Sequence, residues 1–60
     1  MQKIGPDQLG KRLSIRLSDF DGGFRDLIGI YIAEDTIEDR NGDVITFSSK
    51  DIFVWKEIRA

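Results

Sequence analysis

The stretch KRLSIRLSDFDGGFRDLIGIYIA, residues 11–33, decides the fold, because two different apolar patterns meet in it across a turn. In its first part Leu13, Ile15 and Leu17 alternate with polar residues. This period of two is typical of a strand with one buried face. The segment DFDGG, residues 19–23, then interrupts both patterns. We therefore predict a strand that starts near residue 11 and ends at this turn.

A second predicted strand follows the turn, because residues 26–33 are apolar almost throughout. Such a strand is either covered on both faces or bent across the corner of a barrel, in which case Gly29 supplies the bend. Three more strands are predicted at Thr36–Asp39, Asp43–Phe47 and Ile52–Ile58. Helix signals are weak, since β-branched and aromatic residues cluster and no apolar set follows helical spacing.

The hairpin between the third and fourth strands tests the strand register. A two-residue loop at Asn41 and Gly42 would divide the apolar residues between two faces. A three-residue loop that ends with Gly42 in the left-handed region instead places Ile37 opposite Ile45, with Phe47 on the same face. We predict the three-residue loop, because it gathers the larger apolar set on one side.

Five short strands in this arrangement predict an all-β fold, a small five-stranded SH3-like barrel. The barrel domain is expected at residues 11–60. Residues 1–10 hold the only proline and are expected to form an N-terminal lead-in outside the core. An OB barrel is the alternative, but the link at residues 33–35 is too short for the helix that such barrels often carry.

Composition excludes most kinds of chemistry from a chain of 60 residues with no cysteine and no histidine. The usual zinc sites and Ser-His or Cys-His catalytic arrangements cannot form, and we expect no catalytic residue, metal or cofactor. Nine basic and eleven acidic residues give a net charge of −2, which provides no global attraction for nucleic acid. No apolar run is long enough to span a bilayer, so we expect a soluble cytoplasmic protein with no membrane contact.

The series GKRLSIRL, DGGFRDLIGIY, IEDRNGDVITF and SSKDIFVWKEI, between Gly10 and Ile58, carries a resemblance to a known family. It is similar to the N-terminal SH3-like domain that precedes the catalytic domain in a group of bacterial GNAT-superfamily acetyltransferases. The shared features are a glycine and alternating basic residues at the first strand, an Asp-apolar-apolar-Gly element, a hairpin glycine, and an Asp-aliphatic start to the last strand: Gly10, Arg12, Arg16, Asp26–Gly29, Gly42, Asp51 and Ile52.

This resemblance implies a non-catalytic accessory domain whose partner is an adjoining catalytic domain or another protein. Nothing in the chain matches the glycine-rich loop that holds the pyrophosphate of acetyl-CoA in that family. The glycines at 22–23 and 42 have the wrong spacing and are followed by strands, not by a helix. Acetyl transfer is therefore not assigned to these residues.

The loop DFDGG has three interpretations. Its aspartates could ligate calcium, but Gly23 takes the third ligand position and no glutamate stands at the twelfth, which is Ile30. Its aromatic neighbours Phe20 and Phe24 could bind a partner. The interpretation we prefer is a plain turn, in which the glycines supply positive φ and both phenylalanines pack back on the barrel.

Basic and aromatic residues on the first and last strands are the other binding candidates. Arg12 and Arg16 share one side of the first strand, with Arg25 nearby, and Trp55 and Lys56 lie on the last strand. Such a set could bind nucleic acid by charge and stacking. The alternative, which we prefer, is a solvated face whose arginines pair with carboxylates at positions 19, 26 or 57.

An aromatic peptide-binding groove is the remaining candidate. Strict alternation puts Trp55 on the side of Phe53, opposite Ile52 and Val54, either in the core or beside a groove. With Tyr31 as the only tyrosine, the aromatic set is too small to favour polyproline binding. Three hypotheses remain: an acetyltransferase accessory domain, a nucleic-acid-binding barrel, and a protein-binding adaptor.

Overall fold

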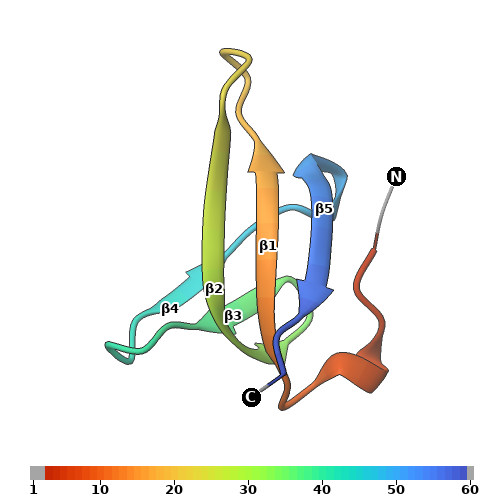
Figure 1. The fold of residues 1–60 in the computed structure, drawn as a ribbon, viewed down its shortest axis with the longest axis vertical. Coiled ribbons are helices and arrows are strands. Elements are labelled where there is room, and N and C mark those ends of the chain that lie inside the picture. The colour runs from red at the N-terminus through yellow and green to blue at the C-terminus, as the bar shows by residue number, and fades with distance from the viewer. Residues whose placement is uncertain (1–2, 60) are drawn as a thin grey trace.

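The computed structural model describes residues 3–59, which form a single five-stranded antiparallel sheet in the order β4-β3-β2-β1-β5 (Figure 1). The elements in chain order are η1 (Pro6–Gln8), β1 (Arg12–Ser18), β2 (Phe24–Ala33), β3 (Thr36–Glu38), β4 (Val44–Thr46), η2 (Ser49–Asp51) and β5 (Ile52–Glu57), where η marks a short 3₁₀ helix. The predicted all-β class and the five predicted strands are confirmed. Within the described residues there is no helix with the length and apolar character needed to cross a membrane.

β1 and β2 form the long hairpin that rises to the top of Figure 1. Their register runs from Arg12 opposite Ile30 to Ser18 opposite Phe24. At the tip, the Asp19 N–H donates to the Gly23 carbonyl at 2.8 Å, and the Gly22 N–H donates to the Asp19 carbonyl at 3.0 Å. Gly22 has a φ of 92°, in the left-handed region that favours glycine. The preferred interpretation of DFDGG as a hairpin turn is confirmed.

β3 and β4 form a shorter hairpin in the predicted register, with Ile37 opposite Ile45. The Gly42 N–H donates to the Asp39 carbonyl at 3.0 Å, and the φ of Gly42 is 86°. This is the predicted three-residue loop. As a result Ile37 is fully buried, while Ile45 and Phe47 pack against the core from the same side.

β2 bends at Gly29, where it passes from pairing with β1 to pairing with β3. A β-carbon at Gly29 would collide with the carbonyl oxygen of Glu38, so only glycine allows this close approach of two backbones. The predicted bend is therefore confirmed. The alternative, a strand covered on both faces, is wrong, because Ile28 and Ile32 are exposed to solvent.

The core lies on the concave side of the sheet and consists of Ile4, Leu13, Ile15, Leu17, Tyr31, Ile37 and Ile52. Ile4 corrects the prediction that the lead-in lies outside the core, since its side chain is only 2% exposed. The Tyr31 hydroxyl ties this segment down, donating to the Ile4 carbonyl at 3.4 Å and accepting the Asp35 N–H at 3.2 Å. Residues 1–2 of the lead-in and residue 60 of the expected barrel lie outside the described residues.

Strands β4 and β5 are the two edge strands of the sheet. No ladder joins them within residues 3–59, so the sheet is bent but not closed. The architecture is therefore an open, strongly bent antiparallel sheet, and closure into a barrel stays a prediction.

Candidate functional site

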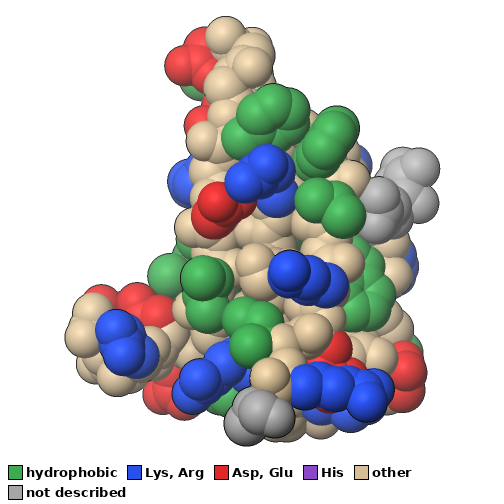
Figure 2. Space-filling model, viewed as in Figure 1, with side chains coloured by type: hydrophobic (Ala, Val, Ile, Leu, Met, Phe, Trp, Pro, Cys, Tyr) green, Lys and Arg blue, Asp and Glu red, His purple; other side chains and the backbone are tan. Residues whose placement is uncertain are grey.

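The convex side of β2, β1 and β5 faces solvent and is called the outer face here. Side chains of directly opposed residues in a sheet share a face, so the register groups them in rows across the three strands. The outer face consists of Arg12, Ser14 and Arg16 from β1, Phe24, Asp26 and Ile28 from β2, and Phe53, Val54 and Lys56 from β5. Figure 2 shows apolar and basic side chains mixed over these strands.

A β-bulge in β5 determines which of its side chains reach this face. Leu17 is opposite Ile52, but the next residue back, Arg16, is opposite Val54, so the ladder passes over Phe53. Phe53 and Val54 therefore both face solvent. Ile52 is buried, and Trp55, which follows the bulge, packs against the core.

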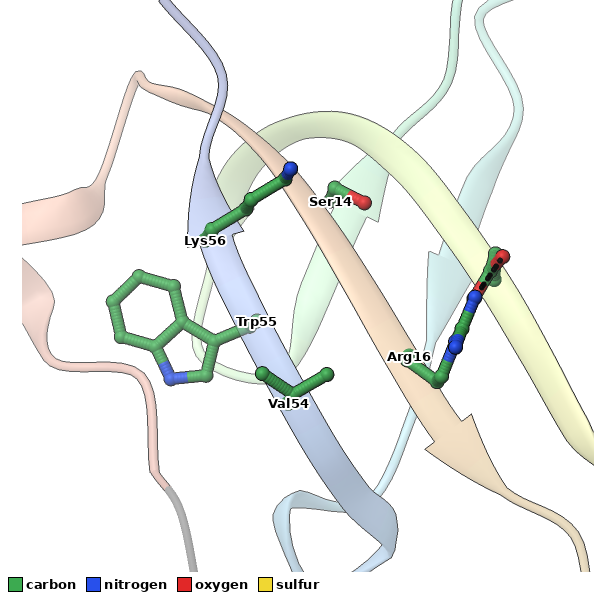
Figure 3. A pocket seen from close by; sticks show the side chains of 6 residues that line it. Ser14, Arg16, Val54, Trp55 and Lys56 are labelled. Carbon is green, nitrogen blue, oxygen red and sulfur yellow. Dashed lines mark hydrogen bonds and ion pairs between the residues drawn. The ribbon is translucent and has the colours of Figure 1, made fainter.

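Of the two alternatives for Trp55, packing against the core is confirmed, but its predicted side relative to its neighbours in the strand is wrong. Strict alternation placed it with Phe53 and away from Ile52, whereas the bulge puts it on the core side together with Ile52. Its indole extends away from Ser14 and Arg16 in Figure 3. Trp55 is thus not available as a stacking platform on the outer face.

An apolar cluster occupies the part of the outer face nearest the β1–β2 turn. The Phe24 and Phe53 rings are 4.9 Å apart between centroids, in a tilted arrangement that suits aromatic quadrupoles. The Arg16 guanidinium lies 5.9 Å from the centre of the Phe24 ring, within cation–π range. The exposed fractions of Phe24, Phe53 and Val54 are 54%, 54% and 46%, so the cluster is open to solvent. Ile28, which is 55% exposed, lies on the same face beyond the Arg16–Asp26 pair, opposite Ser14.

An ion pair crosses the middle of the outer face. Arg16 donates from Nε to Asp26 Oδ1 at 2.9 Å and from Nη2 to Asp26 Oδ2 at 3.3 Å, a two-point contact that fixes both side chains. The hydrogen bond from Arg16 lowers the pKa of Asp26 below its usual value, and the same contact raises the pKa of Arg16. Both groups are therefore charged at neutral pH, and neither is poised for proton transfer.

Beside this pair a shallow hollow of about 340 Å³ opens between β1 and β5 (Figure 3). Its lining residues are Ser14, Arg16, Asp26, Val54, Trp55 and Lys56. Lys56 stands opposite Ser14 in the ladder. Within the described residues Lys56 has no carboxylate partner, and neither has Arg12, whereas Lys11 Nζ lies 3.6 Å from Glu57 Oε1. Arg12 and Lys56 thus form no ion pair among the described residues, although Arg12 lines a second hollow with Glu38 and Asp39.

The structure brings four of the predicted binding residues together on the outer face: Arg12, Arg16, Phe24 and Lys56. The predicted pairing of arginines with carboxylates holds for Arg16 and Arg25 but, among the described residues, not for Arg12. Arg25 does not lie near them, because it is opposite the inward-facing Leu17. Its Nε is instead 3.8 Å from Asp19 Oδ1.

Three other predictions about aromatic residues need correction. Phe20 does not pack back on the sheet, because it is fully exposed at the tip of the β1–β2 turn. Phe24 packs on Phe53 at the surface and not on the core. Tyr31 is buried, with 1% exposure, and lines no exposed aromatic groove together with Trp55.

Sequence reasoning missed Ile28, Phe53 and Val54 as members of the site. Ile28 could have been found, because it is two residues from Asp26 and the period of two puts both on one face. Phe53 and Val54 could not, since the sequence pattern gives no sign of the bulge that turns both of them outward.

Among residues 3–59 no three histidine, cysteine, aspartate or glutamate side chains come close enough to hold a metal ion. In the DFDGG turn, Asp21 Oδ1 accepts the Gly23 N–H at 3.1 Å and so serves the turn itself. Comparisons with known protein families, with curated proteins and with solved structures found no match. The geometry of the outer face is therefore the basis for assigning a function.

Proposed function

We propose that this chain is a non-catalytic interaction domain that docks on a protein partner through its outer face. The observation that carries the proposal is the apolar cluster of Phe24, Phe53 and Val54, each about half exposed, with the exposed Ile28 farther along the same face. A small domain gains stability by burying such side chains, so a contiguous exposed group typically marks a contact surface. The flanking cations Arg12 and Lys56 supply the polar rim that protein interfaces usually have.

The partner we propose is the catalytic domain of a GNAT-type acetyltransferase, covalently attached or closely associated. The resemblance of the strand and turn motifs supports this, and so does the size of the face. Three strands at about 4.8 Å spacing and about six residues at 3.3 Å each give roughly 300 Å². A stable complex between separate proteins needs about 800 Å² on each side. Tethering raises the effective concentration to the millimolar range and makes a small contact sufficient.

The fold assignment belongs to the same proposal: we take the bent sheet as an SH3-like barrel that is open between β4 and β5. Two features support it. The last strand returns to pair with the first, giving the order β4-β3-β2-β1-β5. β2 is shared between both halves of the sheet through its bend at Gly29.

Nucleic-acid binding is the second candidate, favoured by the cations Arg12 and Lys56, which form no ion pair among the described residues, and by two exposed aromatic rings on the same face. Three observations weigh against it. Trp55 faces the core, Arg16 is engaged by Asp26, and the chain has a net charge of −2. Protein docking uses the aliphatic side chains of Ile28 and Val54, for which phosphate contacts offer no role.

An amide-shift titration tests the proposal. The ¹⁵N-labelled chain is titrated with the acetyltransferase catalytic domain encoded by the same or the neighbouring gene. We expect shifts on the outer face, and binding that Val54→Ser weakens by about threefold or more, as loss of buried apolar area requires. Val44→Ser is the matched control, since Val44 is also an exposed valine, 59% against 46% for Val54, and lies on β4.

Shifts confined to other surfaces, or equal effects of the two valine substitutions, would overturn docking through the outer face. A parallel titration with a twelve-residue oligothymidylate distinguishes the second candidate. Shifts there that disappear steeply with added salt would favour nucleic-acid binding instead.

A further inference from the structure

We infer that the hollow between β1 and β5 is a carboxylate site, which takes an aspartate or glutamate side chain from the surface of a protein partner. The inference rests on the proposed function, because it specifies what the outer face recognises. It concerns Ser14, Arg16 and Lys56, which line the hollow together with Val54 (Figure 3).

Two hydrogen-bond donors in the hollow are without an acceptor. The Lys56 ammonium and the Ser14 hydroxyl form no hydrogen bond or ion pair among residues 3–59. The two residues are directly opposed in the β1–β5 ladder, so their side chains emerge side by side. An ammonium and a hydroxyl placed together provide the donors that a carboxylate accepts.

The charge balance of the hollow also favours an anion. Its single acid, Asp26, already accepts two hydrogen bonds from Arg16 through both of its oxygens. The contact uses Nε and Nη2 of Arg16 and leaves Nη1 without a partner among the described residues. With Arg16 and Lys56 positive and Asp26 negative, the lining carries one excess positive charge. Asp26 thus positions Arg16 and does not neutralise Lys56.

The surroundings favour a protein carboxylate over a phosphate. Val54 forms one wall of the hollow, and the Phe24–Phe53 ring pair lies in the next part of the outer face. A carboxylate flanked by apolar side chains can bind the cations of the hollow and, at the same time, place apolar groups against Val54 and the ring pair. A nucleic-acid phosphate is flanked by sugars and bases and would leave the aliphatic wall without a contact.

The aspartates at the hairpin tips of this chain are less suitable occupants than a carboxylate of the partner. The aspartates at the two hairpin tips are engaged locally: Asp21 Oδ1 accepts the Gly23 N–H, and Asp39 Oδ1 accepts the N–H groups of Asn41 and Asp43. The occupant we infer is a surface carboxylate of the partner protein that docks on the outer face, and occupation by a second copy is an outcome of the test below.

Two peptide probes test the site: acetyl-Leu-Glu-Leu-Phe-amide, and the same peptide with glutamine in place of glutamate. At millimolar concentration we expect the glutamate peptide to shift the amides of Ser14, Val54 and Lys56. We expect it to bind about threefold to tenfold more tightly than the glutamine peptide, the range for a charge-assisted contact at an exposed site. Lys56→Gln should abolish this difference. Lys50→Gln, which removes an exposed lysine from η2, should preserve it.

Equal binding of the two peptides, or the absence of shifts at Ser14 and Lys56 with either, would overturn the inference. So would concentration-dependent shifts of these amides without peptide, which would identify a second copy as the occupant, or displacement of the glutamate peptide by oligothymidylate. The two proposals fail separately. If Val54→Ser weakens docking of the catalytic domain and Lys56→Gln does not, the outer face is the docking surface but the hollow is not a carboxylate site.

Discussion

The two hairpin turns of this protein use the same backbone device at opposite ends of the sheet. Each starts at an aspartate, Asp19 or Asp39, whose N–H donates to the carbonyl four residues later at 2.8 or 2.9 Å. Each has a glycine in the left-handed region, Gly22 with φ 92° and Gly42 with φ 86°. In both, this glycine's N–H donates to the aspartate carbonyl at 3.0 Å.

The hairpins differ in their arms and in their tip residues. The first has long arms, whose apolar residues Leu13, Ile15 and Leu17 fill the core, whereas the second has short arms with a single buried residue, Ile37. The residue after the first aspartate is Phe20 in one turn and Arg40 in the other. Two turns of the same geometry with different residues at this position show that the turn does not depend on that side chain. The turn requires the aspartate and the glycine, and the position after the aspartate is free to serve a function.

The largest predicted effect concerns the arms. Ile15→Ala should lower the free energy of unfolding by about 3 kcal/mol, because its side chain is fully buried in the first hairpin. Ile45→Ala, in the partly buried second hairpin, should cost about 1 kcal/mol. Chemical denaturation of both variants measures the difference. Equal costs would mean that the short hairpin contributes as much to the core as the long one.

The next effect concerns the turns themselves. Gly22→Ala and Gly42→Ala should each cost about 1–2 kcal/mol, because alanine is strained at a φ near +90°. Gly23→Ala is the control: Gly23 has no positive φ, and its added β-carbon would lie 3.4 Å from Asp21 Oδ1. Thermal unfolding of the three variants gives the comparison. A marked difference between Gly22→Ala and Gly42→Ala would show that the two turns are not equivalent.

The local patterns of the sequence were sufficient to predict both hairpins. The alternation in β1 predicted which of its side chains face inward. The requirement that the apolar residues on either side of Gly42 share one face predicted the correct register of β3 and β4. The bend at Gly29 also followed from the pattern, because a glycine in an apolar strand marks a close backbone approach. These features depend on residues that are near one another in the chain.

What could not be predicted depends on contacts between distant segments. The bulge at Phe53 arises where β5 joins β1, and it reverses the side on which Trp55 lies. The burial of Ile4 brings the N-terminal segment against the core, where the Tyr31 hydroxyl donates to the Ile4 carbonyl. Phe53 and Val54 join the candidate site through this bulge and were not predicted, whereas Arg12, Arg16, Phe24 and Lys56 were.

A smaller effect tests the ion pair in the arms of the first hairpin. Arg16–Asp26 joins β1 to β2, and within the described residues no ion pair joins β3 to β4. The hydrogen bond from Arg16 lowers the pKa of Asp26, so the pair stabilises the fold above the ordinary carboxyl pKa. This contribution is lost as the pH falls through the lowered pKa of the folded state.

Arg16→Gln should therefore raise the pKa of Asp26 toward its ordinary value and make the acid loss of stability less steep. A titration of the Asp26 carboxyl carbon by NMR measures the pKa in both proteins. Lys50→Gln is the control for a change of net charge alone. A midpoint that is the same in all three proteins would show that the crossing contact does not persist in solution.

The smallest predicted effect on stability comes from exchanging the tip residues. Phe20→Arg and Arg40→Phe should each change the free energy of unfolding by less than about 0.5 kcal/mol, because neither turn uses the side chain at this position. Chemical denaturation checks both variants. A clear loss of stability in Phe20→Arg would give the ring a structural role that its full exposure argues against.

The same variant then tests how far the docking surface extends. Phe20 lies outside the outer face, beyond the Phe24–Phe53 ring pair, so Phe20→Arg should leave docking of the catalytic domain unchanged while Val54→Ser weakens it. If Phe20→Arg weakens docking without loss of stability, the tip of the first hairpin is a second contact with the partner. Because the turn is already ordered, binding there costs little conformational entropy. Phe20 would then serve recognition of the partner. Arg40, at the equivalent position of the second hairpin, would have no such role.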